Sequence, residues 1–191
     1  MMTPFPAESR SRWRRLDVPG VEEARVSRVT GGWELGGALE VEEEGVAARL
    51  RYRIACDWAW RTRSAVVDGS ADGRKVRIDL SADGAGNWVV DGVARPELAG
   101  ALDVDLGFTP ATNSLPIRRM GLAVGEARDV RTAWVRFPEL RVEALEQTYL
   151  REGERAYRYR ALVDGEVFSA RLDVDEFGRV VEYEGLWRAE G

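Results

Sequence analysis

The 191-residue sequence predicts a mainly β fold, and three observations support this prediction. Apolar and charged residues alternate with a period of two along most of the chain, a pattern typical of strands that bury one face. Asp-Gly pairs separate several of these runs, and such pairs are the strongest short-range signal for hairpin turns. A helical pattern occurs in a single segment. We therefore expect a meander of short antiparallel strands, with one short helix against the concave side of a curved sheet.

The alternating runs mark the predicted strands in chain order. The clearest of them cover residues 49–56, 75–80, 102–106, 157–163, 168–174 and 181–187. Asp91-Gly92 and Asp164-Gly165 lie between apolar runs and predict hairpins. Further reversals are predicted at Asp68-Gly69, Asp72-Gly73, Asp83-Gly84, Glu152-Gly153 and Phe177-Gly178. The alternation slips at Ala144-Leu145, which predicts either a bulge or a strand that changes its buried face.

The one helix is predicted at about residues 113–121. Asn113 can cap its start and Gly121 can end it. Arg118 and Arg119 then fall in the last turn, where cations complement the helix dipole. Adjacent helical residues diverge by about 100°, so the two arginines cannot face the interior equally. We expect one to be solvated and the other to reach a buried carboxylate or an anionic ligand.

Composition limits the function classes. The net charge is −5, with acidic and basic residues interleaved, whereas a nucleic-acid-binding protein favours a concentrated basic face. No histidine is present, so Ser-His-Asp catalysis, Cys-His catalysis and histidine metal sites are excluded. We expect no metal, no cofactor and no nucleic-acid partner.

Cellular context and domain organisation are also expected from composition. The single cysteine, Cys56, cannot form an internal disulfide and is expected to be a small buried hydrophobe. The first residues lack an apolar signal-peptide core, and no run approaches the roughly 18 apolar residues of a membrane span. We therefore expect a cytoplasmic protein that does not span a membrane. No linker-like segment divides the chain, so we expect one domain over residues 1–191.

Asp103 and Asp105 are the first candidate site. They lie two residues apart on a predicted strand, so they share a face with Cα atoms about 6.6 Å apart. Three interpretations are open. The two carboxylates can be solvated on the outer face, they can form the acid–base pair of a glycoside hydrolase, or one of them can pair with Arg118 or Arg119. We favour the ion pair.

Tryptophans form the second group of candidates, and the chain has seven: Trp13, Trp33, Trp58, Trp60, Trp88, Trp134 and Trp187. If the alternation before Asp57 continues, Trp58 and Trp60 face inwards while Asp57, Arg61 and Arg63 face outwards. Indole rings with a polar edge commonly line sites for sugars or amphipathic ligands, although core packing explains any single one more simply. Trp134 and Arg136 are expected to share a face opposite Val135 and Phe137.

Several dense segments match one known family. They are Tyr52-Arg-Ile-Ala-Cys-Asp57 with Trp60-Arg-Thr-Arg63, Trp88-Val-Val-Asp-Gly92, Asp103-Val-Asp-Leu106, Thr109-Pro-Ala-Thr-Asn-Ser-Leu-Pro-Ile-Arg-Arg119, Ala133-Trp-Val-Arg-Phe-Pro138, Gln147-Thr-Tyr149, Tyr157-Arg-Tyr159 and residues 173–187. Through them the chain resembles the bacterial putative glycolipid-binding family. The resemblance implies a spiral β-roll, a long antiparallel sheet wrapped around one helix. It also implies a fold similar to that of the lipoprotein carrier and receptor proteins, which hold acyl chains in a half-open barrel.

The leading hypothesis is a non-enzymatic protein that binds a glycolipid or another amphipathic molecule. Its candidate ligand-binding residues are Asp57, Trp60, Arg61, Trp88, Asp103, Asp105, Asn113, Arg118, Arg119 and Trp134. In this hypothesis Trp60 and Trp88 bury apolar ligand surface while the polar residues orient the head group. One alternative is a carbohydrate-active enzyme that uses Asp103, Asp105 or Asp57. The other is an interaction module that forms a homodimer through a sheet edge, with no small-molecule ligand.

Overall fold

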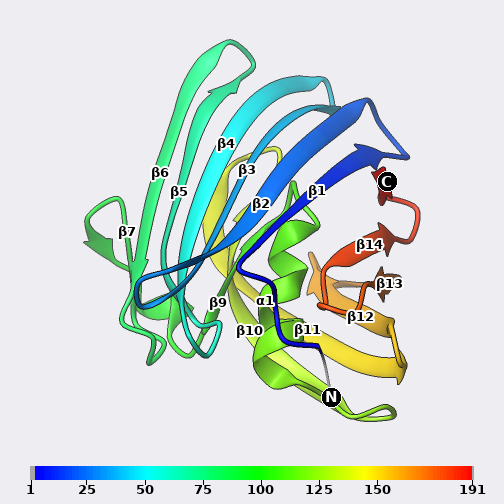
Figure 1. Cartoon of the computed structure of the whole chain (residues 1–191). Helices are drawn as coiled ribbons and strands as arrows, with labels where there is room; N and C mark the ends of the chain where they lie inside the picture. Colours follow the sequence, from blue (N-terminus) through cyan, green and yellow to red (C-terminus); the bar gives the residue numbers. More distant parts are fainter. Residues whose placement is uncertain (1–2, 191) are drawn as a thin grey trace.

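Fifteen strands form one continuous curved sheet in the computed structural model, which describes residues 3–190 (Figure 1). This confirms the predicted mainly β class. The strands are β1 (Glu8–Arg15), β2 (Gly20–Val29), β3 (Gly32–Glu43), β4 (Val46–Asp57), β5 (Thr62–Ala71), β6 (Arg74–Ala82), β7 (Trp88–Val90), β8 (Val93–Ala94), β9 (Asp103–Leu106), β10 (Ala127–Arg136), β11 (Arg141–Gly153), β12 (Ala156–Val163), β13 (Glu166–Val174), β14 (Val180–Tyr183) and β15 (Trp187–Glu190). Their order in the sheet is β8-β7-β6-β5-β4-β3-β2-β1-β15-β14-β13-β12-β11-β10-β9.

The sheet is a meander in two halves that join where β1 pairs with β15. Every neighbouring pair is antiparallel except β9 and β10, which are parallel. The prediction of a purely antiparallel sheet is therefore wrong at this pair. The physical reason is the connection, because a helix joins β9 to β10 and returns the chain to the end of the sheet from which it started.

Most of the predicted turns lie between antiparallel neighbours. Asp91-Gly92 and Asp164-Gly165 both have φ in the left-handed region, at 50° and 80° and at 52° and 84°, as two-residue hairpin loops require. The reversal predicted at Asp68-Gly69 is wrong, because both residues lie inside β5. Gly69 is needed there for close approach: a Cβ atom at this position would lie 2.0 Å from the carbonyl oxygen of Arg49. The reversal predicted at Glu152-Gly153 comes two residues later, at residues 154–155, because β11 continues to Gly153.

The one α-helix of residues 3–190, α1 (Ser114–Met120), directly follows a 3-10 turn, η2 (Ala111–Asn113), and a separate short 3-10 turn, η1 (Pro96–Leu98), lies between β8 and β9. Gly121 ends α1 in the left-handed conformation, as predicted, with φ of 57°. The predicted cap at Asn113 is wrong, because its side chain makes no capping bond. The chain is already helical from Ala111. The Ala111 N–H donates a hydrogen bond to the hydroxyl oxygen of Thr109 at 3.0 Å, so Thr109 caps the segment in place of Asn113.

β9, the strand that leads into the helical segment, is buried on both faces except at Asp105, which is partly exposed. Asp103 and Asp105 lie on one face of β9, opposite Thr132 and Trp134 of β10 in the register. Val104 and Leu106 lie on the other face and are fully buried. The Phe108 ring joins the two halves of the sheet: its centroid lies 6.5 Å from that of Tyr52 and 6.0 Å from that of Phe137.

β11 explains the slipped alternation. Its pairing with β10 is continuous from Ala127↔Leu150 to Arg136↔Arg141, so it has no bulge at Ala144-Leu145. Val142 and Leu145 are both buried although they lie on opposite faces of the strand. The second of the two predicted explanations, a change of buried face, is confirmed.

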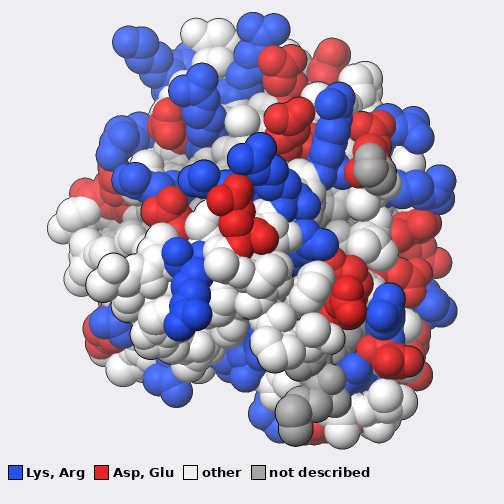
Figure 2. Space-filling model, viewed as in Figure 1, with Lys and Arg blue, Asp and Glu red and all other residues white. Residues whose placement is uncertain are grey.

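The outer surface carries charge of both signs. Basic and acidic side chains are interspersed over the face seen in Figure 2. A cross-strand row on β3–β5 shows the pattern, with Ala38 opposite Arg51 and Arg51 opposite Asp68. Among the residues that the structure describes, no helix is long and apolar enough to cross a membrane.

Candidate functional site

A pocket of about 240 Å³ lies between the N-terminal end of the helical segment and strands β12–β15. Asp105, Asn113 and Trp134, three of the predicted site residues, line it. Asp105 comes from β9 and Trp134 from β10, side by side in the parallel pair. Asn113 comes from η2, which the chain enters directly after β9. We call this space the helix-start pocket.

Aromatic rings form the apolar wall of the helix-start pocket. Tyr159, Phe168, Tyr183 and Trp187 come from four successive strands of the sheet. Tyr159 pairs directly with the strand position of Tyr149, and the two rings meet edge to face at 5.3 Å. The Tyr159 ring also lies 6.1 Å from that of Phe168 and 6.0 Å from that of Tyr183. Rings in such contacts make a stiff wall for an apolar or sugar surface.

Asp105 and Glu43 are the carboxyl groups that line the pocket, and Glu43 is already paired with Arg15. Gln147 donates from Nε2 to Oδ2 of Asp105 at 2.5 Å, and the Thr112 hydroxyl donates to Oδ1 of Asp105 at 3.2 Å. The pKa of Asp105 is raised to about 6, mainly by burial and to a smaller extent by the charge of Asp103, while the hydrogen bonds from Gln147 and Thr112 oppose the rise. The carboxyl group therefore changes charge near neutral pH.

A chain of hydrogen bonds fixes Asp105 to the helical segment. Asn113 donates from Nδ2 to the Tyr149 hydroxyl at 2.9 Å. Tyr149 donates in turn to Oε1 of Gln147 at 3.4 Å, and Gln147 holds Asp105. Because three of these four side chains are buried, the polar groups of the pocket are held in place before any ligand arrives.

The two arginines that line the pocket are already paired. Arg15 lies 2.8 Å from Asp17 and 3.2 Å from Glu43. Arg136 lies 2.6 Å from Asp164, and its guanidinium carbon lies 5.3 Å from the centre of the Trp134 ring. No unpaired cation is therefore found among the described residues that line this pocket.

Asp103 and Arg119 form an ion pair away from the pocket. Asp103 is fully buried, and the Arg119 Nη2 lies 2.6 Å from its Oδ2. Burial raises the pKa of Asp103, and the guanidinium opposes that rise. The favoured interpretation of the aspartate pair, in which one of them binds a helix arginine, is confirmed. Asp103 and Asp105 share a face, but only Asp105 lines the pocket.

Four other predicted residues meet at the opposite end of the helix. Trp60 stacks on Trp33, with ring centroids 4.9 Å apart and planes at 15°. Arg118 lies over the Trp60 ring at 5.2 Å. Asp57 accepts the N–H groups of Ala59 and Arg61 at 2.9 and 3.0 Å, and these bonds shape the turn that carries Trp60.

The neighbouring expectation for Trp58 is wrong, because its side chain is 52% exposed rather than inward. β4 ends at Asp57, so the strand alternation does not continue through the turn. Trp60 still points inwards, but it does so through a left-handed φ of 65°. Arg61 and Arg63 are exposed, as predicted.

Trp88 belongs to neither end of the helix. It is buried in the core, where its indole N–H donates to the carbonyl oxygen of Ala101 at 2.9 Å. Cys56 is buried as expected, and burial raises the pKa of its thiol. The predicted residues thus divide into the pocket, the opposite end of the helix, the buried ion pair and the core.

Sequence reasoning missed much of the pocket wall and the residue that holds Asp105. Tyr159, Tyr183 and Trp187 occupy inward positions of alternating strands, a signal that marks them as buried but does not say against what. Gln147 interrupts an apolar face of β11, and a buried amide needs a partner. In the described part of the chain, no cluster of three or more potential metal ligands is found.

Comparison with known proteins gives a family and two solved folds. A family model described as "Putative glycolipid-binding" matches residues 10–189. A crystal structure of a DUF1089 family protein from Pseudomonas aeruginosa is 31% identical, with a TM-score of 0.76 and coverage of 98% of this chain and 94% of that one. A β-barrel-like DUF1849 protein from Brucella abortus shares the fold at 10% identity, with a TM-score of 0.53 and coverage of 96% and 94%. No curated protein matches.

Proposed function

Because the chain belongs to the putative glycolipid-binding family, we propose that it is a non-enzymatic binding protein whose helix-start pocket takes the uncharged head group of an amphipathic ligand. A glycolipid with a sugar head group fits this description. The observation that carries the proposal is the combination of an aromatic wall with a fixed hydrogen-bond chain and lining arginines that already pair with carboxylates.

The charges favour a sugar over a phosphate or carboxylate head group. Arg15 and Arg136 are each held by carboxylates, so neither offers a free fork to an anion. Asp105 adds a group that is ionised above about pH 6 and that accepts hydrogen bonds from hydroxyls. Sugar rings present an apolar face to aromatic side chains and hydroxyls at their edge, which matches the two kinds of lining.

The size of the pocket limits what enters it. Its volume of about 240 Å³ lies below the roughly 300–1,000 Å³ typical of pockets for drug-sized ligands. One sugar ring fits, whereas two acyl chains do not. The acyl part would then lie outside, where the β12–β13 hairpin exposes Phe168, Leu162 and Val167. Such exposed apolar groups beside a pocket are typical of ligand-binding edges.

The arrangement gives less support to the two alternatives. A glycosidase acting through paired aspartates needs two carboxylates at one ligand, and Arg119 already holds Asp103. A homodimer through a sheet edge needs a long free strand, but the end strands β8 and β9 have only 2 and 4 residues. β9 is further covered by Thr62, whose hydroxyl accepts the N–H of Val104 at 3.0 Å.

Titration with octyl glucoside, kept below the concentration at which it forms micelles, tests the proposal by calorimetry. We expect saturable binding that Trp134→Ala weakens about tenfold. Trp58→Ala is the matched control, because Trp58 is an exposed indole that does not line the pocket. Dodecyl phosphate is the charged comparison and is expected to bind less well. Equal affinity in wild type and Trp134→Ala would reject the pocket.

A further inference from the structure

Residues 3–7 form a strap across the end of the roll opposite the helix-start pocket. The strap precedes β1 and has no regular secondary structure (Figure 1). Thr3 donates its N–H to the carbonyl oxygen of Glu176 at 3.3 Å, and Ala7 accepts the N–H of Arg28 at 2.7 Å. Its middle residue, Phe5, is only 9% exposed.

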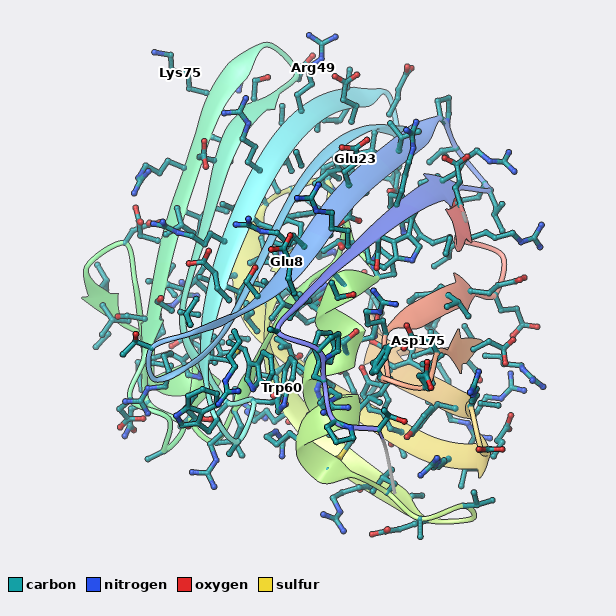
Figure 3. The ribbon with its side chains drawn as sticks, viewed as in Figure 1. Glu8, Glu23, Arg49, Trp60, Lys75 and Asp175 are labelled. Atoms are coloured by element: carbon teal, nitrogen blue, oxygen red, sulfur yellow. The ribbon has the colours of Figure 1, made fainter. Side chains whose placement is uncertain are left out.

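Phe5 fills a socket made of other aromatic rings. Its centroid lies 5.4 Å from Trp33, 5.2 Å from Trp60 and 5.9 Å from Phe177. Trp60 lies at the lower end of the roll beside the helix (Figure 3). Other rings hold the Phe5 ring on three sides, but the segment that carries it lies outside the sheet, where local opening costs less free energy than in core strands.

The socket also contains the guanidinium of Arg118, whose hydrogen bonds go to carbonyl oxygens of the strap and of the loop at Phe177. The guanidinium of Arg118 lies 5.3 Å from the Phe5 ring and 5.2 Å from the Trp60 ring. Its Nη1 donates to the carbonyl oxygens of Thr3 and Phe177, each at 3.0 Å. Its Nε is buried and has no hydrogen-bond partner. Without the strap, Arg118 would present one buried donor and one newly freed donor.

Asp175 is the acidic residue whose charge acts on Arg118, but the two side chains form no ion pair. The carboxylate oxygens of Asp175 are held by Arg179, whose Nε lies 2.6 Å from Oδ2, and by the N–H groups of Phe177 and Arg179. Arg118 is therefore a cation with capacity left for an anion, in contrast to Arg15 and Arg136 at the pocket.

The backbone of Trp60 has an unusual conformation that places its indole in the socket. Trp60 adopts a left-handed φ of 65°, which is an outlier for a bulky residue. Such conformations cost roughly 1–3 kcal/mol and persist only where the surroundings enforce them. This one turns the indole under Arg118 and Phe5, where it stacks on Trp33.

We propose that this aromatic socket is a second binding site, for the carboxylate end of a single acyl chain, and that Phe5 occupies it until such a ligand displaces the strap. The carboxylate would take the free donors of Arg118, and the first methylene groups would replace the Phe5 ring between Trp60 and Phe177. The site lies at the C-terminal end of the helix, so it is separate from the helix-start pocket and has the opposite charge preference.

Decanoate binding to Phe5→Ala tests the proposal. We expect this variant to bind decanoate at least tenfold more tightly than wild type, and the further change Arg118→Gln to reverse that gain. Octyl glucoside is the control ligand: its affinity is expected to be the same in wild type and Phe5→Ala, because it binds at the other end. An equal decanoate affinity in wild type and Phe5→Ala, or a gain that survives Arg118→Gln, would overturn the proposal.

A measurement on the wild-type protein guards against a variant that does not fold. Decanoate is expected to increase hydrogen exchange in residues 3–7, because the strap leaves the socket when the ligand enters. Octanol, which has a similar chain without the carboxylate, is expected to have a much smaller effect. If decanoate leaves the exchange of the strap unchanged at saturation, the socket is a fixed part of the core and the proposal is wrong.

Discussion

Arg119 holds Asp103 with two of its nitrogen atoms, Nη2 at 2.6 Å from Oδ2 and Nε at 3.1 Å from Oδ1. Asp103 is the first residue of β9 and belongs to a pair of aspartates that the sequence presents as equivalent, and this contact makes the two carboxylates different. One is fixed to the last turn of α1, while the other faces a pocket. The ion pair thus ties the helix to β9 and leaves Asp105 as the only member of the pair that a ligand can reach.

Arg119→Ala is expected to destabilise the protein by about 3–5 kcal/mol, because it leaves the buried carboxylate of Asp103 without a partner. Arg119→Lys should cost less but not nothing, since an ammonium cannot form the two-nitrogen contact. Denaturant unfolding measures both. The double variant Asp103→Asn, Arg119→Ala is expected to be more stable than Arg119→Ala alone. A double variant that is less stable would show that the buried charge is not the cause.

Glu22 makes stability depend on pH. Its side chain is buried, its Oε1 accepts the hydroxyls of Tyr52 at 2.6 Å and Thr109 at 2.7 Å, and its Oε2 has no partner. Burial raises the pKa of Glu22 to about 7. The folded state then binds a proton that the unfolded state has lost, so this contribution to stability is complete below about pH 4.5 and is lost as pH rises through 7.

Glu22→Gln should remove that loss. Between pH 5 and pH 8 the free energy of unfolding of wild type is expected to fall by about 2–3 kcal/mol more than that of the variant. Glu23→Gln is the matched control, because Glu23 is exposed on the outer face (Figure 3). Urea unfolding at several pH values checks this. Parallel pH curves for wild type and Glu22→Gln would contradict the assignment.

Asp105 should make ligand affinity depend on pH. Because burial raises its pKa to about 6, the carboxylate forms as pH rises from 5 to 7.5, and a carboxylate accepts hydrogen bonds from sugar hydroxyls more strongly than a neutral acid does. Octyl glucoside is therefore expected to bind more tightly at pH 7.5 than at pH 5. The Asp105→Asn variant is expected to bind octyl glucoside about tenfold more weakly than wild type at pH 7.5. Its affinity for octyl glucoside should be nearly constant between pH 5 and pH 7.5. A pH profile that survives the substitution would assign it to another group.

Gly69 tests the close packing of the sheet. A Cβ atom there would lie 2.0 Å from the Arg49 carbonyl oxygen, and φ is 144°, so Gly69→Ala is expected to destabilise by at least about 2 kcal/mol. Gly36→Ala is the control on a nearby strand, where the nearest atom would lie at an ordinary 3.6 Å. Thermal unfolding compares the two. Equal melting temperatures would mean that β4 and β5 are not as close as described.

Local signals account for the parts of the fold that the sequence predicts correctly. Asp91-Gly92 is recognisable because a two-residue hairpin loop of this kind requires a left-handed φ at both positions. Gly121 is recognisable because helices commonly end at a glycine with a left-handed φ. Asp68-Gly69 has the same letters but a different cause: the glycine makes room for Arg49 of the next strand. The local sequence around Asp68-Gly69 does not reveal a contact with a neighbouring strand, so a turn was wrongly predicted there.

The site is less predictable than the fold because the curvature of the sheet brings together residues that are far apart in the sequence. Asp105 and Tyr159 are 54 residues apart in the chain and line one pocket only because the sheet curls around the helix. Trp60 and Arg118 illustrate the same limit, since nothing local to either says that Phe5 lies between them and solvent. Asp103 was predictable in part, because a buried strand carboxylate near two helix arginines has few other ways to be satisfied.

The indole N–H resonances of the seven tryptophans show where a sugar ligand binds, because they report both ends of the helix in one spectrum. Titration of ¹⁵N-labelled protein with octyl glucoside is expected to shift the signals of Trp134 and Trp187, which line the pocket, and to leave Trp33, Trp58 and Trp60 in place. Saturable shifts confined to the second group, or none at all, would contradict a sugar-binding pocket at the start of the helix.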